Sequence, residues 1–312
     1  MRTFLTVVVG FILIVAALIW YAATPDIARS VLEVKYARPP SEFIDLPDGA
    51  RVHVRDQGPR DAPALVLVHG SNASLFTWEP WASRLDKTFR VVSFDLPGHG
   101  LTGAVPNHDY SQEGMVKFTQ EVADKLGLKK FAIAGNSMGG GVAARFAEEH
   151  PDRVSALILV DAGGMPTPQG TSVPFVFKYG RTPGIRWLLL HITPRWLVTE
   201  GLNKAIVRKQ IINERMIDEY WDFARMAGTR QATAERFALP WNHDVQNHIG
   251  DIKAPTLILW GEKDGLIPVI AAHEFHDAIP GSKLIIYPNT GHIPQEEVAD
   301  QSAADVRAFL TR

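Results

Sequence analysis

A serine between two glycines is the feature of this 312-residue chain whose residue types most clearly allow chemistry. The pentapeptide Gly-Asn-Ser-Met-Gly at residues 135–139 follows an apolar run at residues 131–134 and precedes a helix-like segment at residues 140–150. Because glycine has no Cβ, the chain can turn sharply there and expose the hydroxyl of Ser137 at the apex. Such a serine is a candidate nucleophile, and the alternative is a Gly/Ser turn without a catalytic role.

A serine hydroxyl becomes a nucleophile at neutral pH only when a base removes its proton and an acid orients that base. Asp264 follows the apolar run at residues 256–260, where the end of a strand would present its carboxylate. His292 lies in a Gly-His-Ile-Pro segment shortly after the last apolar run. The chain order Ser137, Asp264, His292 predicts a catalytic triad, and Asp161, which follows another apolar run, is the competing acid.

The apolar runs predict the elements that must hold these side chains. Uninterrupted apolar segments of this length suit strands that are buried on both faces of a parallel sheet. They occupy residues 64–68, 91–94, 131–134, 156–160, 256–260 and 283–287, preceded by two short strands at 42–46 and 51–55. Helical segments at residues 78–85 and 111–126 alternate with them, which predicts a mostly parallel, doubly wound α/β sheet.

In these motifs the chain resembles the serine-nucleophile branch of the α/β-hydrolase superfamily, over about residues 42–312, including its esterases, lipases and meta-cleavage C–C hydrolases. The segment His-Gly-Ser-Asn, which contains Ser71 and Asn72, resembles the family's loop after the third strand. The resemblance implies an oxyanion hole made by the backbone N–H groups of Ser71 and Met138, with Asn72 as a neighbour that binds substrate. Some relatives place the acid of the triad where this chain has Asp161.

Two other histidines lie in glycine turns that the family also has. His69 belongs to the loop after the third predicted strand, and His99 to the segment Asp-Leu-Pro-Gly-His-Gly at residues 95–100, which resembles the turn after the fourth strand. We expect structural or pocket-rim roles for both. No metal site is predicted, because cysteine is absent, there is no His-Glu-x-x-His motif, and His273 and His276 suit the surface of a late helix.

The interval between residues 160 and 256 breaks the alternation of strands and helices. Residues 165–249 are predicted to form a helical cap over the catalytic end of a core that comprises residues 42–164 and 250–312. The stretch 165–240 carries eleven Lys/Arg against six Asp/Glu. This surplus is typical of a solvated helical face, and an anion site is the alternative.

Four residues are candidates for contact with a substrate. Trp187 and Trp196 belong to an apolar stripe in the predicted cap, Ile293 follows the triad histidine, and Asn72 follows the oxyanion segment. The sequence pattern does not separate pocket lining from cap core for the two tryptophans.

The N-terminus carries twenty uncharged, mostly apolar residues from position 4 to position 23. About 20 helical residues span a hydrocarbon core of ~30 Å, and the aromatic pair Trp20-Tyr21 suits a headgroup interface. We therefore expect a transmembrane helix within residues 1–24, followed by a polar linker at residues 25–41. The alternative is a cleaved signal peptide, although its apolar region would be unusually long. The short N-terminal tail favours a catalytic domain on the non-cytoplasmic side of the membrane.

Composition excludes several classes of function. A formal net charge of −2 provides no basic field for nucleic acid, and the absence of cysteine removes thiol catalysis and disulfides. No glycine-rich segment has the spacing of a dinucleotide or P-loop motif, so no cofactor is expected.

A serine at the elbow implies acyl transfer, whereas dehalogenases and epoxide hydrolases of the superfamily use aspartate there. The expected activity is hydrolysis of a small-molecule carboxylic ester, including lipid-like or acyl-chain esters. C–C hydrolysis of ring-cleavage products and a haloperoxidase-like perhydrolase are the alternatives. The C–C hydrolases typically have His-Gly-x-Gly-Pro-Gly and an aromatic residue after the histidine, where this chain has His-Gly-Ser-Asn-Ala-Ser and Ile293. A membrane-tethered binding protein on a hydrolase scaffold would not need the triad.

Overall fold

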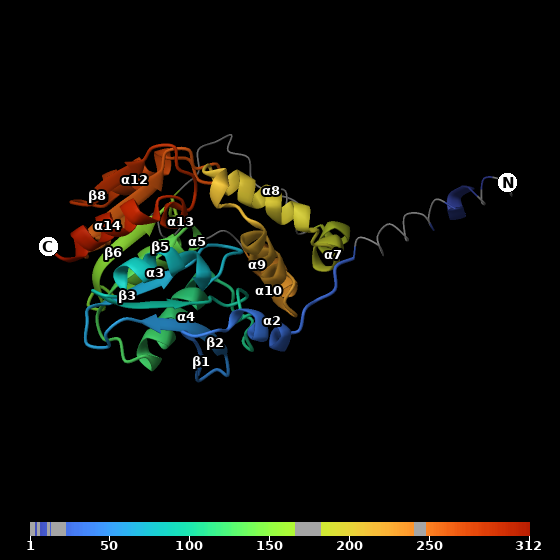
Figure 1. Cartoon of the computed structure of the whole chain (residues 1–312), viewed down its shortest axis with the longest axis horizontal. Coiled ribbons are helices and arrows are strands. Elements are labelled where there is room, and N and C mark those ends of the chain that lie inside the picture. Colours follow the sequence, from blue (N-terminus) through green and yellow to red (C-terminus); the bar gives the residue numbers. More distant parts are fainter. Residues whose placement is uncertain (1–3, 5–6, 11–12, 14–22, 166–181, 240–247) are drawn as a thin grey trace.

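An eight-stranded sheet forms the centre of the computed structural model, which describes the chain except for residues 1–3, 5–6, 11–12, 14–22, 166–181 and 240–247 (Figure 1). The strand order is β1-β2-β4-β3-β5-β6-β7-β8. The strands are β1 (Ser41–Asp45), β2 (Arg51–Gln57), β3 (Ala64–Val68), β4 (Arg90–Phe94), β5 (Phe131–Asn136), β6 (Val154–Val160), β7 (Thr256–Gly261) and β8 (Lys283–Tyr287). Strands β3 to β8 pair in parallel, and β1 and β2 form an antiparallel edge. The prediction of a mostly parallel sheet is confirmed.

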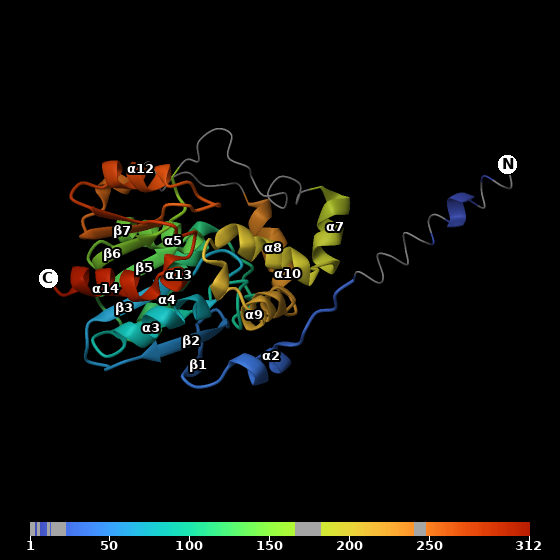
Figure 2. The ribbon, with the colours of Figure 1, turned by 45° about the horizontal axis from the view of Figure 1, so that its top comes forward.

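Helices cover both faces of this sheet, which explains why its parallel strands are largely apolar (Figure 2). On one face lie α4 (Gln112–Lys125), α5 (Met138–Glu149) and α12 (Ile270–Ala278), which share one apolar core with the sheet. On the other face lie α3 (Glu79–Leu85) and α14 (Ala299–Leu310), which share a second core. The short helices η1 (Leu75–Trp78), η3 (Ile249–Asp251) and α13 (Pro294–Glu297) complete this layer arrangement.

The register of the parallel strands brings the loops that carry chemistry to one edge. Val68 pairs with Gly135, Asn136 pairs with Val160, and Val160 pairs with Leu259. Because the carboxyl ends of parallel strands meet at the same edge, the loops after β3, β5, β6 and β7 lie together.

A cap of helices lies at this edge, between β6 and β7 in the sequence (Figures 1 and 2). It contains α7 (Pro183–His191), α8 (Arg195–Ala205), α9 (Glu214–Ala224) and α10 (Thr229–Ala238), with the short helix η2 (Lys209–Ile211). An apolar cluster joins α8 and α9 to the core through Leu202, Ile206, Ile217 and Ile293.

The segment before the sheet differs from the polar linker expected at residues 25–41. It contains a helix, α2 (Arg29–Tyr36), whose residue Leu32 is buried in a cluster with Phe223 and Met226 of the cap region. The backbone N–H of Ile27 also donates to the carbonyl of Arg225 at 2.8 Å. Nothing in the sequence pattern indicated this helix, because Leu32 is its one buried residue, which is too little for a periodic pattern.

Within the described residues, no helix is long and apolar enough to cross a membrane. The transmembrane helix expected at residues 4–23 lies largely outside the residues that the structure describes.

Candidate active site

Ser137 lies at the turn between β5 and α5 with an unusual backbone conformation. Its φ is 54° and its ψ is −121°, a region that L-residues rarely adopt. The carbonyl of Ser137 accepts the backbone N–H groups of Gly140 at 2.9 Å and Gly163 at 2.7 Å, and its own N–H donates to the carbonyl of Val160 at 3.1 Å. These three hydrogen bonds hold the strained turn in place, with the serine partly exposed.

The glycines of the motif are required by close backbone contacts. A Cβ at Gly135 would overlap the carbonyl oxygen of Gly139, and a Cβ at Gly139 would overlap that of Val68. Gly70, in the loop after β3, lies so close that a Cβ there would come within 3.0 Å of the Cβ of Ser137. The loop that contains Gly70 therefore packs directly against the candidate nucleophile.

A cap residue, Arg236, contacts both Ser71 and Met138. The backbone N–H groups of these two residues are the expected oxyanion hole. Nη2 of Arg236 donates to Oγ of Ser71 at 2.8 Å, and Nη1 of the same side chain lies 3.4 Å from Sδ of Met138. Arg236 lies on α10 and is not part of a sequence motif, so nothing in the sequence distinguished it from the other basic residues of the cap. Burial lowers the pKa of its guanidinium to about 10.

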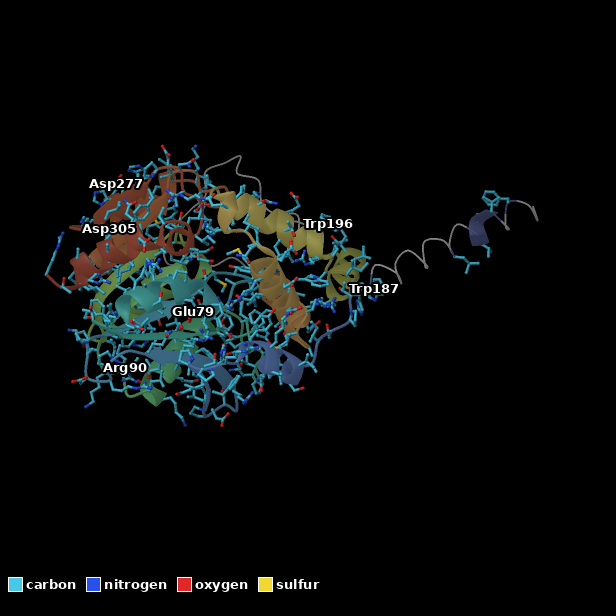
Figure 3. All side chains as sticks on the ribbon, viewed as in Figure 1. Glu79, Arg90, Trp187, Trp196, Asp277 and Asp305 are labelled. Atoms are coloured by element: carbon cyan, nitrogen blue, oxygen red, sulfur yellow. The ribbon has the colours of Figure 1, made fainter. Side chains whose placement is uncertain are left out.

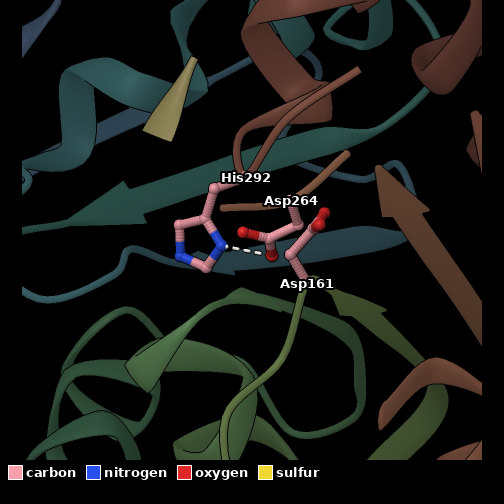
Figure 4. A group of neighbouring side chains, drawn as sticks. All are labelled: Asp161, Asp264 and His292. Carbon is pink, nitrogen blue, oxygen red and sulfur yellow. Dashed lines mark hydrogen bonds and ion pairs between the residues drawn. The ribbon is translucent and has the colours of Figure 1, made fainter. Parts of the chain in front are cut away.

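His292 and Asp264 form the hydrogen bond expected of a base and the acid that orients it. Nδ1 of His292 lies 2.7 Å from Oδ2 of Asp264, and both side chains are buried (Figure 4). The other ring nitrogen, Nε2, points away from Asp264 (Figure 4). The second carboxylate oxygen of Asp264 accepts the backbone N–H groups of Leu266 at 2.7 Å and Ile267 at 3.1 Å. The acid is thus fixed by three donors, which leaves Nε2 as the base.

Asn136 connects the nucleophile turn to the histidine loop. Its side-chain amide donates to the carbonyl of His292 at 3.0 Å and to the carbonyl of Val160 at 3.1 Å. Across the described residues, Ser137 Oγ makes no hydrogen bond with His292, and such bonds often tighten only when substrate binds. The pattern marked Asn136 as part of the pentapeptide but gave no sign of this bridging role.

Asp161, the competing acid, lies beside Asp264 (Figure 4) but does not contact the imidazole in the described structure. One of its carboxylate oxygens accepts the backbone N–H of Gly261 at 3.0 Å. Burial, reinforced by the charge of Asp264, raises the pKa of Asp161 well above its ordinary value. The structure therefore favours Asp264 as the acid, because its carboxylate is the one that contacts the imidazole.

Asp161, Asp264 and His292 also form a group that could in principle hold a metal ion, because one ligand atom of each lies within 4.8 Å of the others. The oxygens of Asp264 are already used by the imidazole and two backbone N–H groups. A carboxyl whose pKa is raised well above its ordinary value, as that of Asp161 is, is a weaker ligand for a cation. This donor set therefore fits the hydrogen bonds that it already makes better than it fits metal binding.

His69 and His99 are buried and hold backbone rather than acting as bases. Nε2 of His69 accepts the N–H of Leu96 at 3.0 Å, while Nδ1 of His99 lies 2.8 Å from the carbonyl of Pro97. Burial, followed by the charge of Arg236 for His99, lowers the pKa of that imidazole well below its ordinary value. Burial also lowers the pKa of His69, despite the opposing charge of Asp95.

Asp95 ties three segments together. Its carboxylate accepts the N–H groups of Leu75 and Leu101, each at 2.7 Å, and pairs with Nδ1 of His53 at 2.7 Å. Each partner lies in a different part of the chain, and the carboxylate is fully buried. The turn that begins at Asp95 thus has the structural role that the resemblance implied.

The four residues expected to contact substrate have different surroundings. Ile293 is buried at the junction of core and cap, next to the histidine. Asn72 is exposed, with a positive φ of 59°. Trp187 and Trp196 are 47% and 65% exposed and lie on the outer side of the cap (Figure 3), so the structure does not bring them to the triad.

Two acidic residues with raised pKa values lie on α9 of the cap and on α13 of the core. Oε1 of Glu296 accepts the hydroxyl of Thr77 at 2.5 Å, and burial raises the pKa of Glu296 to about 7. Burial, together with the charge of Glu296, raises the pKa of Glu219 to about 8. The other charged groups that act on Glu219 are Arg215, Asp95 and Arg55.

Comparison with known proteins agrees with this fold and this order of motifs. The family model described as alpha/beta hydrolase fold matches residues 63–299. The chain therefore belongs to the α/β-hydrolase family and is a hydrolase by family membership.

Its relatives differ in their named activities. A 2-hydroxy-6-oxononadienedioate/2-hydroxy-6-oxononatrienedioate hydrolase of Klebsiella pneumoniae is 30% identical over 284 residues, which cover 87% of this chain and 96% of that protein. The crystal structure of a putative lipase from Acinetobacter baumannii superposes with a TM-score of 0.75 at 25% identity, covering 93% of this chain and 98% of that one. A meta-cleavage product hydrolase from Pseudomonas fluorescens gives a TM-score of 0.75 at 22% identity, covering 86% and 97%, which shows the shared fold.

Proposed function

We propose that this protein hydrolyses a carboxylic ester through an acyl-enzyme formed on Ser137. The observation that carries the proposal is the 2.7 Å bond between His292 and Asp264, on loops that meet a strained serine turn. Asn136 links the two loops, since it directly precedes the serine and holds the carbonyl of His292. A binding protein on the same scaffold would not require an oriented histidine.

The proposed reaction has two acyl transfers. Nε2 of His292 takes the proton of Ser137 as Oγ attacks the ester carbonyl, and the N–H groups of Ser71 and Met138 stabilise the oxyanion. The carbon–oxygen bond then breaks, and the protonated imidazole gives its proton to the leaving alkoxide. Water, deprotonated by His292, next attacks the acyl-enzyme, releasing the carboxylic acid and returning the proton to Ser137.

A second candidate is hydrolysis of a carbon–carbon bond in a ring-cleavage product. It is favoured by the 30% identity to a hydrolase whose named substrates are 2-hydroxy-6-oxo-dienedioates and trienedioates. Ile293, where those enzymes typically have an aromatic residue, and the Ser-Asn sequence at residues 71–72 favour the ester reaction instead. A haloperoxidase-like perhydrolase would use the same triad, and no contact among the described residues favours it.

Labelling with a fluorophosphonate tests the nucleophile. The purified chain should be labelled and should hydrolyse p-nitrophenyl esters of short or medium chain length, and Ser137→Ala should abolish both. Failure of the wild-type chain in both assays would exclude the serine-hydrolase proposal. Turnover of a 2-hydroxy-6-oxo-dienoate at a higher kcat/KM than any ester would select the second candidate.

We also propose that residues 4–23 anchor the chain in a membrane, with the catalytic domain on the non-cytoplasmic side. The uncharged twenty-residue segment supports this, as does Thr24, whose N–H donates to the carbonyl of His191 on α7 at 3.0 Å. Thr24 thus lies at the end of α7 that carries His191 and the exposed side chain of Trp187, a residue type common at membrane interfaces. After carbonate extraction the protein should stay in the membrane pellet, and recovery in the soluble fraction would refute the anchor.

A further inference from the structure

Arg236 is a cation at the candidate oxyanion hole for which the described structure offers no carboxylate partner. The side chain reaches from α10 to Ser71 and Met138, the two residues whose N–H groups are expected to bind the oxyanion. The cation packs against the ring of its neighbour Phe237, with the guanidinium carbon 4.4 Å from the ring centroid. In the described part of the chain, no ion pair to Arg236 is formed.

Three other arginines of the cap, unlike Arg236, have carboxylate partners in the part of the chain that the structure describes. Arg195 pairs with Glu214 and Asp218, and Arg225 pairs with Asp222. On α10 itself, Arg230 pairs with Asp26 at 2.5 Å. A partly buried cation without a counter-ion is unfavourable unless an anion from outside the described structure neutralises it.

The hydrogen-bond donors of Arg236 indicate which kind of anion would fit. A guanidinium has five N–H donors, and the two contacts with Ser71 and Met138 use one donor on each terminal nitrogen. One N–H on each of Nη1 and Nη2, and the N–H of Nε, have no acceptor among the described residues. Parallel donors in one plane match the two oxygens of a carboxylate.

We infer that Arg236 binds a carboxylate that the substrate carries in addition to its scissile ester, so that the preferred substrates are half-esters of dicarboxylic acids or esters of hydroxy acids. This inference rests on the proposed ester hydrolysis, because Arg236 would hold the carboxylate beside the carbonyl that Ser137 attacks. The basic surplus of the cap then has a specific use at one position, while Arg195, Arg225 and Arg230 form ordinary ion pairs.

Matched substrates that differ only in the extra charge test the inference. On the acyl side, the pair is mono-p-nitrophenyl adipate and p-nitrophenyl hexanoate; on the leaving-group side, it is 4-acetoxybenzoate and 4-acetoxybenzamide. The wild-type chain should prefer the anionic member of at least one pair. In Arg236→Gln the ratio of kcat/KM values, anionic to neutral, should fall about 30-fold, mostly through KM, as expected for loss of charged hydrogen bonds. Arg236→Lys should retain part of the preference.

Two control variants distinguish binding of a substrate carboxylate by Arg236 from positioning of the Ser71 loop by the same side chain. Arg230→Gln removes the same charge from the same helix but lies against Asp26, so it should leave the ratio unchanged. Ser71→Ala removes the hydroxyl that accepts from Arg236 but keeps the backbone N–H. If Arg236 only positioned the loop of Ser71, both Arg236→Gln and Ser71→Ala would lower kcat equally for charged and neutral substrates, and that result would overturn the inference.

Competitive inhibition shows which kind of anion Arg236 binds. Adipate should compete with p-nitrophenyl hexanoate in the wild-type chain and lose about 30-fold in affinity in Arg236→Gln. Inhibition by inorganic phosphate without inhibition by adipate would assign the site to phosphate and refute a carboxylate. A wild-type chain that hydrolyses the neutral esters without any preference for the anionic ones would refute the inference alone, whereas loss of all ester hydrolysis would refute the proposed function.

Discussion

The strained backbone of Ser137 predicts that two inactive variants of this residue differ in stability. Ser137→Ala and Ser137→Gly both remove the hydroxyl and abolish turnover. They differ only in Cβ, which is unfavourable at a φ of 54° and a ψ of −121°. We expect Ser137→Gly to be the more stable of the two, although glycine normally destabilises a folded chain relative to alanine.

The magnitude follows from two opposing terms. A non-glycine residue in this region of φ/ψ space costs about 1–3 kcal/mol, and glycine relieves that cost. Glycine also gains more freedom in the unfolded chain, which costs about 0.5–1 kcal/mol. The difference favours glycine by about 1 kcal/mol, which corresponds to roughly 2 °C in Tm for a domain of this size.

Urea and thermal unfolding of the full-length chain in detergent measure the difference, with Ala304→Gly as the control. Ala304 is exposed within α14, where helical backbone is unstrained, so the same change from alanine to glycine should destabilise the protein by about 1 kcal/mol. At position 137 the change from alanine to glycine should instead stabilise the protein. If Ser137→Gly is less stable than Ser137→Ala by the amount seen at the control position, the turn stores no strain and the reasoning is wrong.

Three further predictions test the site. Asp264→Asn should lower kcat about 10⁴-fold and Asp161→Asn less than about 10-fold, because only Asp264 contacts the imidazole; equal losses would show that the acid is shared. Glu219 and Glu296 have pKa values raised to about 8 and 7, so their stabilising contribution is complete below about pH 4.5 and is lost as pH rises through 7–8. Glu219→Gln should therefore gain stability over wild type between pH 5 and pH 8.5, by about 2 kcal/mol in urea titrations. Gly70→Ala places a Cβ 3.0 Å from that of Ser137 and should lower kcat about 10-fold with a small loss of Tm; an unchanged kcat would mean that the loop moves freely.

The strands were predictable because burial on both faces leaves a continuous apolar run. The run at residues 64–68 coincides with β3, and that at 256–260 lies within the fully buried strand β7. The triad candidates were predictable for a related reason, since each lies in the loop that follows a strand identified by such a run. Their roles as nucleophile, acid and base stay predictions until kinetics test them.

Other features could not be read from the pattern. Helix α2 has a single buried residue, Leu32, so its sequence resembles a polar linker. Trp187 and Trp196 were expected near the substrate because large apolar residues usually are buried, yet both are largely exposed on the cap. The role of Asn136 depends on the carbonyl of His292, 156 residues away, and no local signal encodes such a contact.

The position of Arg236 shows how the core turn and the cap depend on each other. Gly98, in the turn after β4, has a φ of 79°, and a Cβ at this position would lie 3.0 Å from that of Ala232 on α10. The absence of a side chain at Gly98 lets α10 approach the core closely, and Arg236, one turn further along the same helix, then reaches Ser71. The absence of a side chain at Gly98 therefore also lets the cap's cation reach the loop of the candidate oxyanion hole. The packing of α10 against this turn thus couples the cap to the core at the candidate site.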